Sequence, residues 1–184
     1  MKKNTLGVQH ILGFTFWLVS TAASAGGREA AWVSWVDDGD TIKVTLVETK
    51  AEATIRLTDI DAPEIGHGQS RPGQPFGRKA KATMSQMLHH KYVDLECYPG
   101  DTYGRRICRV FVEGVDAGEA LVAMGLAWAY RENPRYVRDK HIYAVEESAQ
   151  RARLGLWSAP QNMPPWEWRK ACWQRQECPE GGDQ

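Results

Sequence analysis

The sequence lacks any excess of charge, and this absence argues against one large class of binding proteins. Lysine and arginine together number 23, aspartate and glutamate also number 23, and the formal net charge is zero. A protein that coats nucleic acid electrostatically is usually strongly basic, with the charge gathered on one face. Any contact that this chain makes with phosphate groups must therefore depend on a few well-placed side chains.

Long apolar runs are also absent, with one exception at the N-terminus. Two lysines precede residues 11–19, which are almost wholly apolar, and Ala23-Ser24-Ala25 follows as a small-x-small cleavage site. The run is too short to span a bilayer comfortably as a helix, although an uncleaved anchor is the alternative. We predict a signal peptide over residues 1–25, so that the mature protein is periplasmic or secreted.

Cysteine is scarce, and its spacing argues against a zinc site. The four cysteines are 11, 64 and 6 residues apart, so none forms the C-x-x-C pair typical of structural zinc. No H-E-x-x-H sequence and no acidic EF-hand ladder occurs either. An even number of cysteines in an exported chain favours two disulfides. Of the three pairings, we favour Cys97–Cys108 and Cys172–Cys178, because each pair is close in sequence and the first would brace a hairpin.

The length that remains after cleavage suits one ordinary domain. Removal of the signal leaves 159 of the 184 residues, with 21 basic and 23 acidic side chains, because the signal carries two lysines and no acids. A chain of this size can bury a core of its own. We predict a domain over residues 26–158 and a C-terminal extension over residues 159–184. In that extension we expect Trp166-Glu167-Trp168 to dock on the domain and the tail after Pro179 to be disordered. We expect a monomer.

Residue patterns predict a five-stranded OB-type barrel with three helices. Segments rich in Val, Ile, Thr and Trp indicate strands, and apolar residues at helical spacing indicate helices. The order of three strands, a helix, two strands and two helices is typical of a small barrel with helices packed on it. Two strands are expected within 32–47, broken at 37–40, and others at 53–60, 93–98 and 106–112, with helices at 76–88, 116–125 and 135–154 and a hairpin turn at 99–101.

Carboxylates gather where predicted strands end. Asp38 and Asp40 lie at the junction of the first two strands, and Asp59, Asp61 and Glu64 follow the third. Carboxylates that converge from two loops form an oxygen-rich site that suits a hard cation such as calcium. Taken singly, each motif is more often a turn than a ligand, since Asp-Gly is a common hairpin signal.

Two arginines lie at positions suited to phosphate. Arg56 lies in the third strand between two apolar residues, so it points away from them, and Arg105 begins a later strand. Arginine binds phosphate bidentately, although a lone arginine more often forms an ion pair on a barrel surface. Strict alternation places Arg56 and Asp61 on opposite faces. A shared site therefore requires a bulge or turn at residues 59–61.

Together these motifs resemble the staphylococcal nuclease (thermonuclease) family. The resemblance spans about residues 33–157 and rests on three charged motifs in the order and spacing of the family. It implies an OB-fold of the staphylococcal nuclease type and calcium-dependent hydrolysis of DNA or RNA, which usually breaks the P–O5′ bond and leaves a 3′-phosphate. The motifs are Asp38-Gly39-Asp40-Thr41, Arg56-Leu57-x-x-Ile60-Asp61-Ala62-Pro63-Glu64 and Asp101-x-Tyr103-Gly104-Arg105.

The resemblance implies one calcium ion and a ligand role for four residues. Asp40 and Asp61 would bind the ion through their side chains, and Asp38 would hold a water molecule bound to it. Ala62 stands where the family commonly has threonine and would bind through its backbone carbonyl, so the missing hydroxyl need not matter.

The resemblance also implies which residues handle the substrate. Arg56 and Arg105 would grip the phosphate, and Glu64 would orient or deprotonate the attacking water. Thr102 replaces a lysine of the best-known family member, which weakens the expected hold on a terminal phosphate. The residues expected to contact the nucleotide are Tyr103, Tyr130 and Thr102.

Two other hypotheses belong to different functional classes. One is an inactive OB-fold module that binds nucleic acid without cleaving it. The other is a cell-envelope protein whose acidic loops only bind calcium. We favour the nuclease, because both carboxylate groups and both arginines are present and the net charge argues against electrostatic coating.

Overall fold

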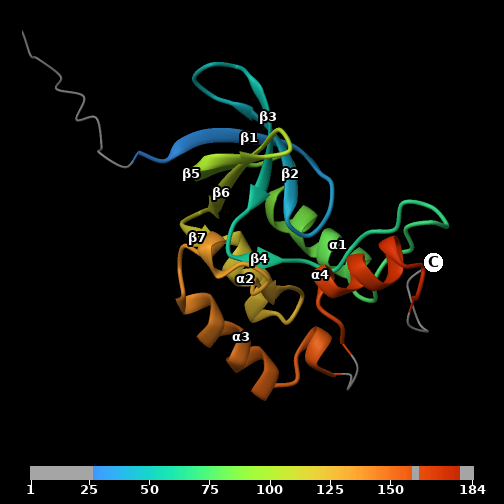
Figure 1. Ribbon diagram of the computed structural model, residues 1–184. Helices are drawn as coiled ribbons and strands as arrows, with labels where there is room; N and C mark the ends of the chain where they lie inside the picture. Colours follow the sequence, from blue (N-terminus) through green and yellow to red (C-terminus); the bar gives the residue numbers. More distant parts are fainter. Residues whose placement is uncertain (1–26, 159–161, 179–184) are drawn as a thin grey trace, which may run out of the picture.

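Five long strands close into a barrel in the computed structural model (Figure 1), which describes residues 27–158 and 162–178 and, over residues 100–102, the backbone alone. The predicted signal peptide and the tail after Pro179 lie outside these residues. The five-stranded barrel with helices confirms the predicted fold class.

The strands follow one another around the barrel through antiparallel pairs, apart from one parallel closure. β1 (Glu29–Val36) pairs with β2 (Thr41–Leu46) and β5 (Tyr92–Thr102), β2 pairs with β3 (Glu52–Leu57), and β5 pairs with β6 (Arg105–Val112). β3 and β6 run parallel and close the ring. Closure removes the exposed edges that an open sheet would present to other chains.

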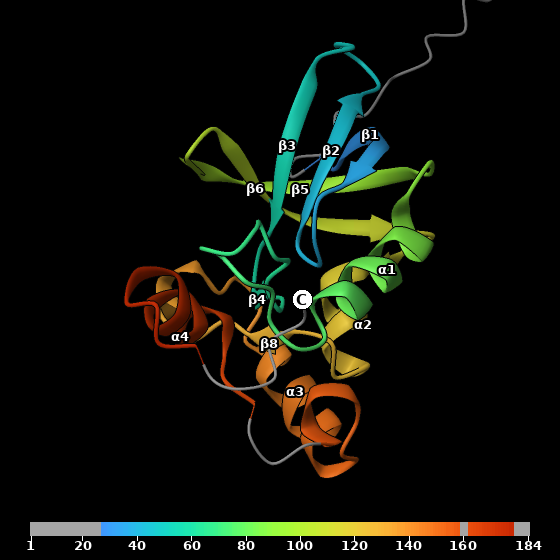
Figure 2. The ribbon, with the colours of Figure 1, turned by 90° about the vertical axis from the view of Figure 1, so that its right-hand side faces the viewer.

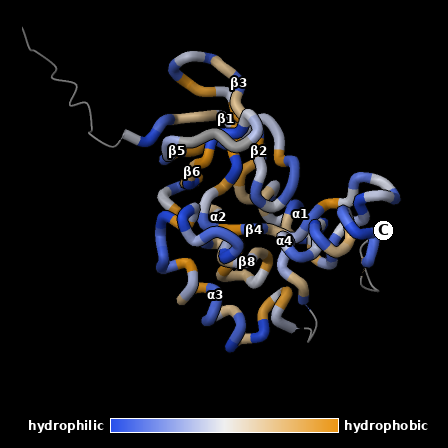
Figure 3. Tube along the Cα trace, in the orientation of Figure 1, coloured by the Kyte–Doolittle hydropathy of each residue, from blue (hydrophilic) through white to orange (hydrophobic). Residues whose placement is uncertain are grey.

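Alternating apolar residues of the strands fill the barrel. Ala31 and Val33 point inward from β1, and a register shift between Val33 and Trp35 lets Val36 point inward as well. Ile42 and Ile55 are fully buried on the neighbouring strands. Polar and apolar residues alternate along the tube in Figure 3, as expected for strands with one face in the core.

The third predicted strand is wrong beyond Leu57, where the chain turns. Asp59 has a φ of +71°, and the chain resumes as β4 (Ile60–Asp61), which pairs with β8 (Trp128–Ala129) beside the barrel. A positive φ cannot continue a strand. The bulge or turn that the sequence requires at residues 59–61 is thereby confirmed.

The hairpin turn predicted at residues 99–101 is wrong. β5 continues through those residues with an irregular register, and the chain reverses at Tyr103 and Gly104. These residues have φ values of +61° and +76°, as in the two-residue turns that match the twist of a hairpin. The later turn places Arg105 directly opposite Thr102.

In the part of the chain that the structure describes, three helices have seven or more residues, and they lie on one side of the molecule (Figure 2). The first two pack on the barrel strands, whereas the third packs on the second. α1 (Gly77–Leu88) buries an apolar stripe, and α2 (Ala117–Ala123) begins as predicted, because the Asp116 side chain accepts a hydrogen bond from the Glu119 backbone N–H at 3.0 Å. Among the described residues, no helix is long and apolar enough to cross a membrane.

The helix predicted over residues 135–154 is shorter than expected. Pro134–Tyr136 forms a separate 3-10 turn, and α3 (His141–Arg151) follows after an extended Val137. Asn133 and Asp139 cause the interruption, because their side chains accept hydrogen bonds from the backbone two residues ahead and each begins a new turn. Gly155, with a φ of +49°, follows the end of α3.

A C-terminal segment lies beside the loop that follows β4. It contains α4 (Pro165–Trp168) and the π-helical turn η3 (Arg169–Gln174). The short strand β7 (Val115–Asp116) lies elsewhere, paired antiparallel with the end of β6. Trp168 is 2% exposed and donates its indole N–H to the Pro72 carbonyl at 3.2 Å.

Both disulfides join the cysteines that the sequence analysis favoured. Cys97 and Cys108 face each other across β5 and β6, and Cys172 and Cys178 close the C-terminal turn. Within the described residues no cysteine is free.

Candidate active site

A cleft of about 630 Å³ opens beside the end of β3 and gathers most of the predicted site residues. Its walls come from the loop between β1 and β2, the segment after β3, the β5–β6 turn and the C-terminal segment. Asp61 lies beneath the surface and reaches the cleft through the arginines that line it. For Thr102 the structure describes only the backbone. The predicted residues that line the cleft are Asp38, Asp40, Arg56, Ala62, Glu64, Tyr103, Arg105 and Tyr130.

Arg56 joins the two carboxylates predicted to bind calcium. Its guanidinium pairs with Asp40 and donates to Asp61 Oδ1 at 2.6 Å. Asp40 and Asp61 are 3% and 1% exposed, so both carboxylates are withdrawn from bulk water. The turn at Asp59 is what brings Arg56 and Asp61 to one face, since an unbroken strand would separate them.

Local geometry fixes the first acidic loop against the second. Asp40 Oδ2 accepts a hydrogen bond from the Ala62 backbone N–H at 2.6 Å, and Asp38 Oδ1 accepts one from the Asp40 N–H at 2.9 Å. A side chain at Gly39 would place its Cβ 2.5 Å from the Ala62 Cβ, so only glycine allows this approach. Burial raises the pKa of Asp38, and the nearby Arg56 partly opposes that rise.

Glu64 lies on the loop after β4, where its backbone is held on both sides. Gln74 donates its backbone N–H to the Glu64 carbonyl at 2.9 Å, and the Gln74 side chain accepts from the Glu64 N–H at 3.2 Å. A Cβ at Gly77 would lie 2.3 Å from the same carbonyl, so glycine lets α1 begin close to Glu64. Burial raises the pKa of Glu64, while Arg169 acts to lower it.

Arg105 and the two predicted tyrosines line other parts of the cleft. Arg105 follows the β5–β6 turn, and burial together with the charge of Arg56 lowers its pKa. Tyr103, at the tip of the turn, is 94% exposed and forms part of the rim. Tyr130 is half-buried, with its ring edge-on to Trp166 at 5.8 Å between centroids.

Arg169 is a cleft residue that the sequence analysis missed. Its guanidinium donates to Asp61 Oδ2 at 2.8 Å and to Glu64 Oε1 at 2.5 Å, so it joins a predicted calcium ligand to the predicted catalytic carboxylate. Burial acts to lower its pKa, but the hydrogen bonds to Asp61 and Glu64 outweigh burial and raise it. The one signal in the sequence is its place directly after Trp168, in a segment expected to dock.

Acidic groups outnumber basic groups in the cleft, which bears on whether a cation fits. Six carboxylates, counting Asp61, face four arginines. An excess of carboxylate oxygens matches what a hard divalent cation requires. Among the described residues, no three His, Cys, Asp or Glu side chains form a ready-made metal centre, because Arg56 and Arg169 lie between the carboxylates. The carboxylates are Asp38, Asp40, Asp59, Asp61, Glu64 and Glu132, and the arginines are Arg56, Arg71, Arg105 and Arg169.

Comparison with known proteins identifies the family. Residues 54–159 match the family described as staphylococcal nuclease homologue. A micrococcal nuclease of Shigella flexneri is 34% identical over 143 residues, which cover 73% of this chain and 76% of that protein. Protein ParB of Escherichia coli is 36% identical over 142 residues, covering 72% and 75% respectively. An uncharacterized endonuclease of Haemophilus influenzae is 32% identical over 155 residues, covering 83% and 81%. The chain therefore belongs to the staphylococcal nuclease family.

Proposed function

We propose that this protein is an exported, calcium-dependent nuclease that hydrolyses phosphodiester bonds of DNA or RNA. The observation that carries the proposal is the convergence of Asp40, Asp61, Arg56, Glu64 and Arg105 on one cleft. Membership of a family with nuclease-named relatives supports the same reaction class. Export rests on the predicted signal peptide, and the two disulfides are compatible with an oxidising compartment.

The residues around the acidic pair suit a calcium ion. Asp40 and Asp61 would hold it through their side chains, Ala62 through its carbonyl and Asp38 through a water molecule. When bound, the ion would neutralise charge on the phosphoryl oxygens and offset the acidic excess of the cleft, which would otherwise repel an anionic substrate.

Arg56, Arg105 and Glu64 would carry out the remaining chemistry. The two guanidiniums would donate hydrogen bonds to the phosphoryl oxygens, on which negative charge grows as water attacks. Glu64 would orient that water or accept its proton, and a raised pKa brings a carboxylate closer to the value that suits a base near neutral pH. Attack in line with the 5′ oxygen would break the P–O5′ bond and leave a 3′-phosphate.

The test is hydrolysis of single-stranded DNA by the mature protein, with calcium and with a chelator. We expect calcium-dependent cleavage that Glu64→Gln and Arg105→Ala each reduce by about a hundredfold or more, the usual loss when a group that stabilises a transition state is removed. Glu147→Gln and Arg151→Ala are matched controls on the exposed face of α3, where the two side chains pair with each other. Binding without cleavage under every divalent metal tried would refute the nuclease and favour the inactive OB-fold module.

A further inference from the structure

One wall of the cleft comes from residues outside the motifs of the proposed catalytic site. His67 and Arg71 belong to the loop after β4, and Arg169 and Trp173 belong to η3. We call these four residues the C-terminal wall. Arg169 and Trp173 lie beyond residue 159, where the match with the family ends.

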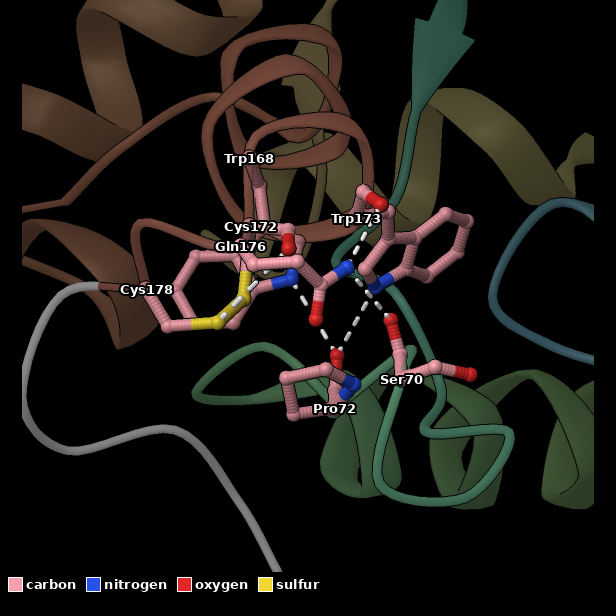
Figure 4. Close-up of a disulfide and its surroundings, with 7 residues drawn as sticks. All are labelled: Ser70, Pro72, Trp168, Cys172, Trp173, Gln176 and Cys178. Atoms are coloured by element: carbon pink, nitrogen blue, oxygen red, sulfur yellow. Dashed lines mark hydrogen bonds between the residues drawn. A yellow bond between two sulfur atoms is a disulfide. The ribbon is translucent and has the colours of Figure 1, made fainter.

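The backbone around this wall is fixed by contacts between the C-terminal segment and the loop (Figure 4). The indoles of Trp168 and Trp173 both donate to the Pro72 carbonyl, at 3.2 and 3.0 Å, and Gln176 donates to the Ser70 carbonyl at 3.2 Å. Trp168 is the buried anchor of the segment. Trp173 remains partly exposed and lines the cleft, so its ring is not needed to fill the interior.

Charged and aromatic groups meet on the wall in a combination suited to a nucleotide. The Arg71 guanidinium lies 5.6 Å from the centre of the Trp173 ring, and the His67 ring lies edge-on to it at 6.3 Å. Among the described residues Arg71 has no carboxylate within ion-pair distance, so its charge is available to an anion. Bases of any sequence stack on aromatic side chains in single-strand binding sites, with arginines beside them for the phosphates.

The position of Arg169 places this wall next to the proposed reaction centre. Arg169 contacts Glu64 and Asp61 and lies four residues before Trp173 in the same helical turn. A nucleotide on the wall would therefore be a close neighbour of the phosphate that is cleaved.

We propose that the C-terminal wall is a second nucleotide-binding subsite, which holds the nucleotide next to the scissile phosphate. Trp173 stacks on the base, and Arg71 contacts a phosphate of the neighbouring nucleotide. This inference rests on the proposed nuclease function, because it places the subsite relative to the bond that is broken.

The experiment measures affinity and cleavage separately in the full mature chain. Affinity is measured by the anisotropy of a fluorescein-labelled single-stranded DNA of about twelve nucleotides in calcium, in a Glu64→Gln background that slows cleavage. Cleavage is kcat/KM for the same oligonucleotide and for an unlabelled dinucleotide, with Glu64 intact. Trp173→Leu, Trp173→Phe and Arg71→Gln are compared, and Arg175→Gln is the matched control, an exposed arginine of the same segment that pairs with Glu177 away from the cleft.

We expect Trp173→Leu to weaken oligonucleotide binding by about tenfold, the usual loss of one stacked base, and Arg71→Gln to weaken it several-fold. Arg71→Gln should lose more kcat/KM on the oligonucleotide than on the dinucleotide, because the dinucleotide has no second phosphate for Arg71 to contact. Trp173→Leu should lose kcat/KM on both substrates, because both place a nucleotide next to the scissile phosphate. Trp173→Phe should retain most of the affinity, because it keeps a ring while losing the N–H that donates to Pro72.

Three results would overturn the subsite. If Trp173→Phe loses as much affinity as Trp173→Leu, then Trp173 acts through its hydrogen bond to Pro72 and only docks the segment. If Arg71→Gln loses kcat/KM equally on both substrates, Arg71 acts at the scissile phosphate and not on the phosphate of a neighbouring nucleotide. Absence of cleavage by the unsubstituted chain would refute the proposed function instead, whereas cleavage that is insensitive to Trp173 and Arg71 would refute the subsite alone.

Discussion

At the scale of single residues, Arg169 directly contacts one carboxylate of the proposed calcium site. Its guanidinium lies 2.8 Å from an oxygen of Asp61, where it competes with any other cation for that carboxylate. Removal of one positive charge at this distance strengthens the attraction of a partly buried site for a divalent ion. We therefore expect Arg169→Gln to bind calcium at least about tenfold more tightly. Isothermal titration calorimetry would measure this, with Arg175→Gln as the control, and weaker binding would mean that Arg169 instead orients Asp61 for the ion.

Glu146 provides a pH-dependent contribution to stability. It is 0% exposed, accepts a hydrogen bond from the Ala129 N–H at 2.8 Å and pairs with Arg131, yet burial raises its pKa above the ordinary 4.5. A raised pKa means that the folded state holds the proton more tightly than the unfolded state. The contribution of Glu146 to stability is therefore largest below about pH 4.5 and falls as the pH rises through the folded pKa.

Glu146→Gln removes this titration, so its stability relative to the parent should improve from about pH 5 to pH 8. Urea unfolding at both pH values measures the difference. Glu147→Gln changes an exposed neighbour on the same helix and should show no such trend. If the stability of Glu146→Gln relative to the parent instead falls as the pH rises, the ion pair with Arg131 outweighs the cost of burying Glu146.

Site residues that lie in short sequence motifs could be predicted, whereas a residue that reaches the site from a distant part of the sequence could not. Asp38, Asp40, Asp61 and Glu64 lie in short motifs, and the motifs lie at strand ends that pattern alone locates. Arg169 reaches Asp61 across 108 residues of sequence, through a segment whose docking depends on contacts that no local pattern encodes.

At the scale of elements, the two disulfides stabilise different parts of the molecule. Cys97–Cys108 joins two barrel strands, whereas Cys172–Cys178 closes a turn of the C-terminal segment. Among the described residues, the buried apolar cluster of the barrel includes none beyond Ile142, so the barrel core does not depend on that segment. Loops this short predict that each bridge contributes about 2 to 3 kcal/mol to the stability of the part of the molecule that it closes, which is the barrel for the first and the C-terminal segment for the second.

We expect the double variant Cys97→Ala/Cys108→Ala to lower Tm by about 5 to 10 °C while keeping oligonucleotide affinity. Cys172→Ala/Cys178→Ala should leave Tm nearly unchanged and weaken oligonucleotide affinity, because it loosens η3 and the cleft wall but leaves the barrel core intact. Calorimetry and anisotropy on both variants check the contrast. Equal losses of Tm would show that the C-terminal segment unfolds together with the barrel.

Element boundaries were less predictable than element types, for local reasons. The hairpin turn lies at Tyr103 and Gly104, because both residues adopt a positive φ. The turn-forming residues Pro99-Gly100-Asp101 predict the turn a few residues too early. The predicted last helix began too early because apolar periodicity continued through Asp139, whose side chain instead caps a separate turn. In both cases a backbone choice outweighed the periodic pattern.

At the scale of the whole molecule, the order of strands and helices sufficed to predict the barrel, but not its closure by the parallel pair of β3 and β6. That pair joins segments about fifty residues apart, and pairing between distant strands has no local signature.

The zero net charge has a consequence at this same scale. The few arginines in the cleft must supply most of the electrostatic attraction to the substrate.

Four cleft arginines set an upper limit on the salt dependence of binding. Each neutralised phosphate of a single strand adds about −0.7 to the slope of log affinity against log salt, so the slope should be about −3 or shallower. Anisotropy in calcium from about 50 to 300 mM KCl, in the Glu64→Gln background, measures it. Arg105→Ala should make the slope shallower by about 0.7, since one phosphate contact is lost. Arg151→Ala, on the exposed face of α3, should leave the slope unchanged. A slope steeper than about −5 would require an extended basic contact outside the cleft, and would favour a module that binds nucleic acid along its surface.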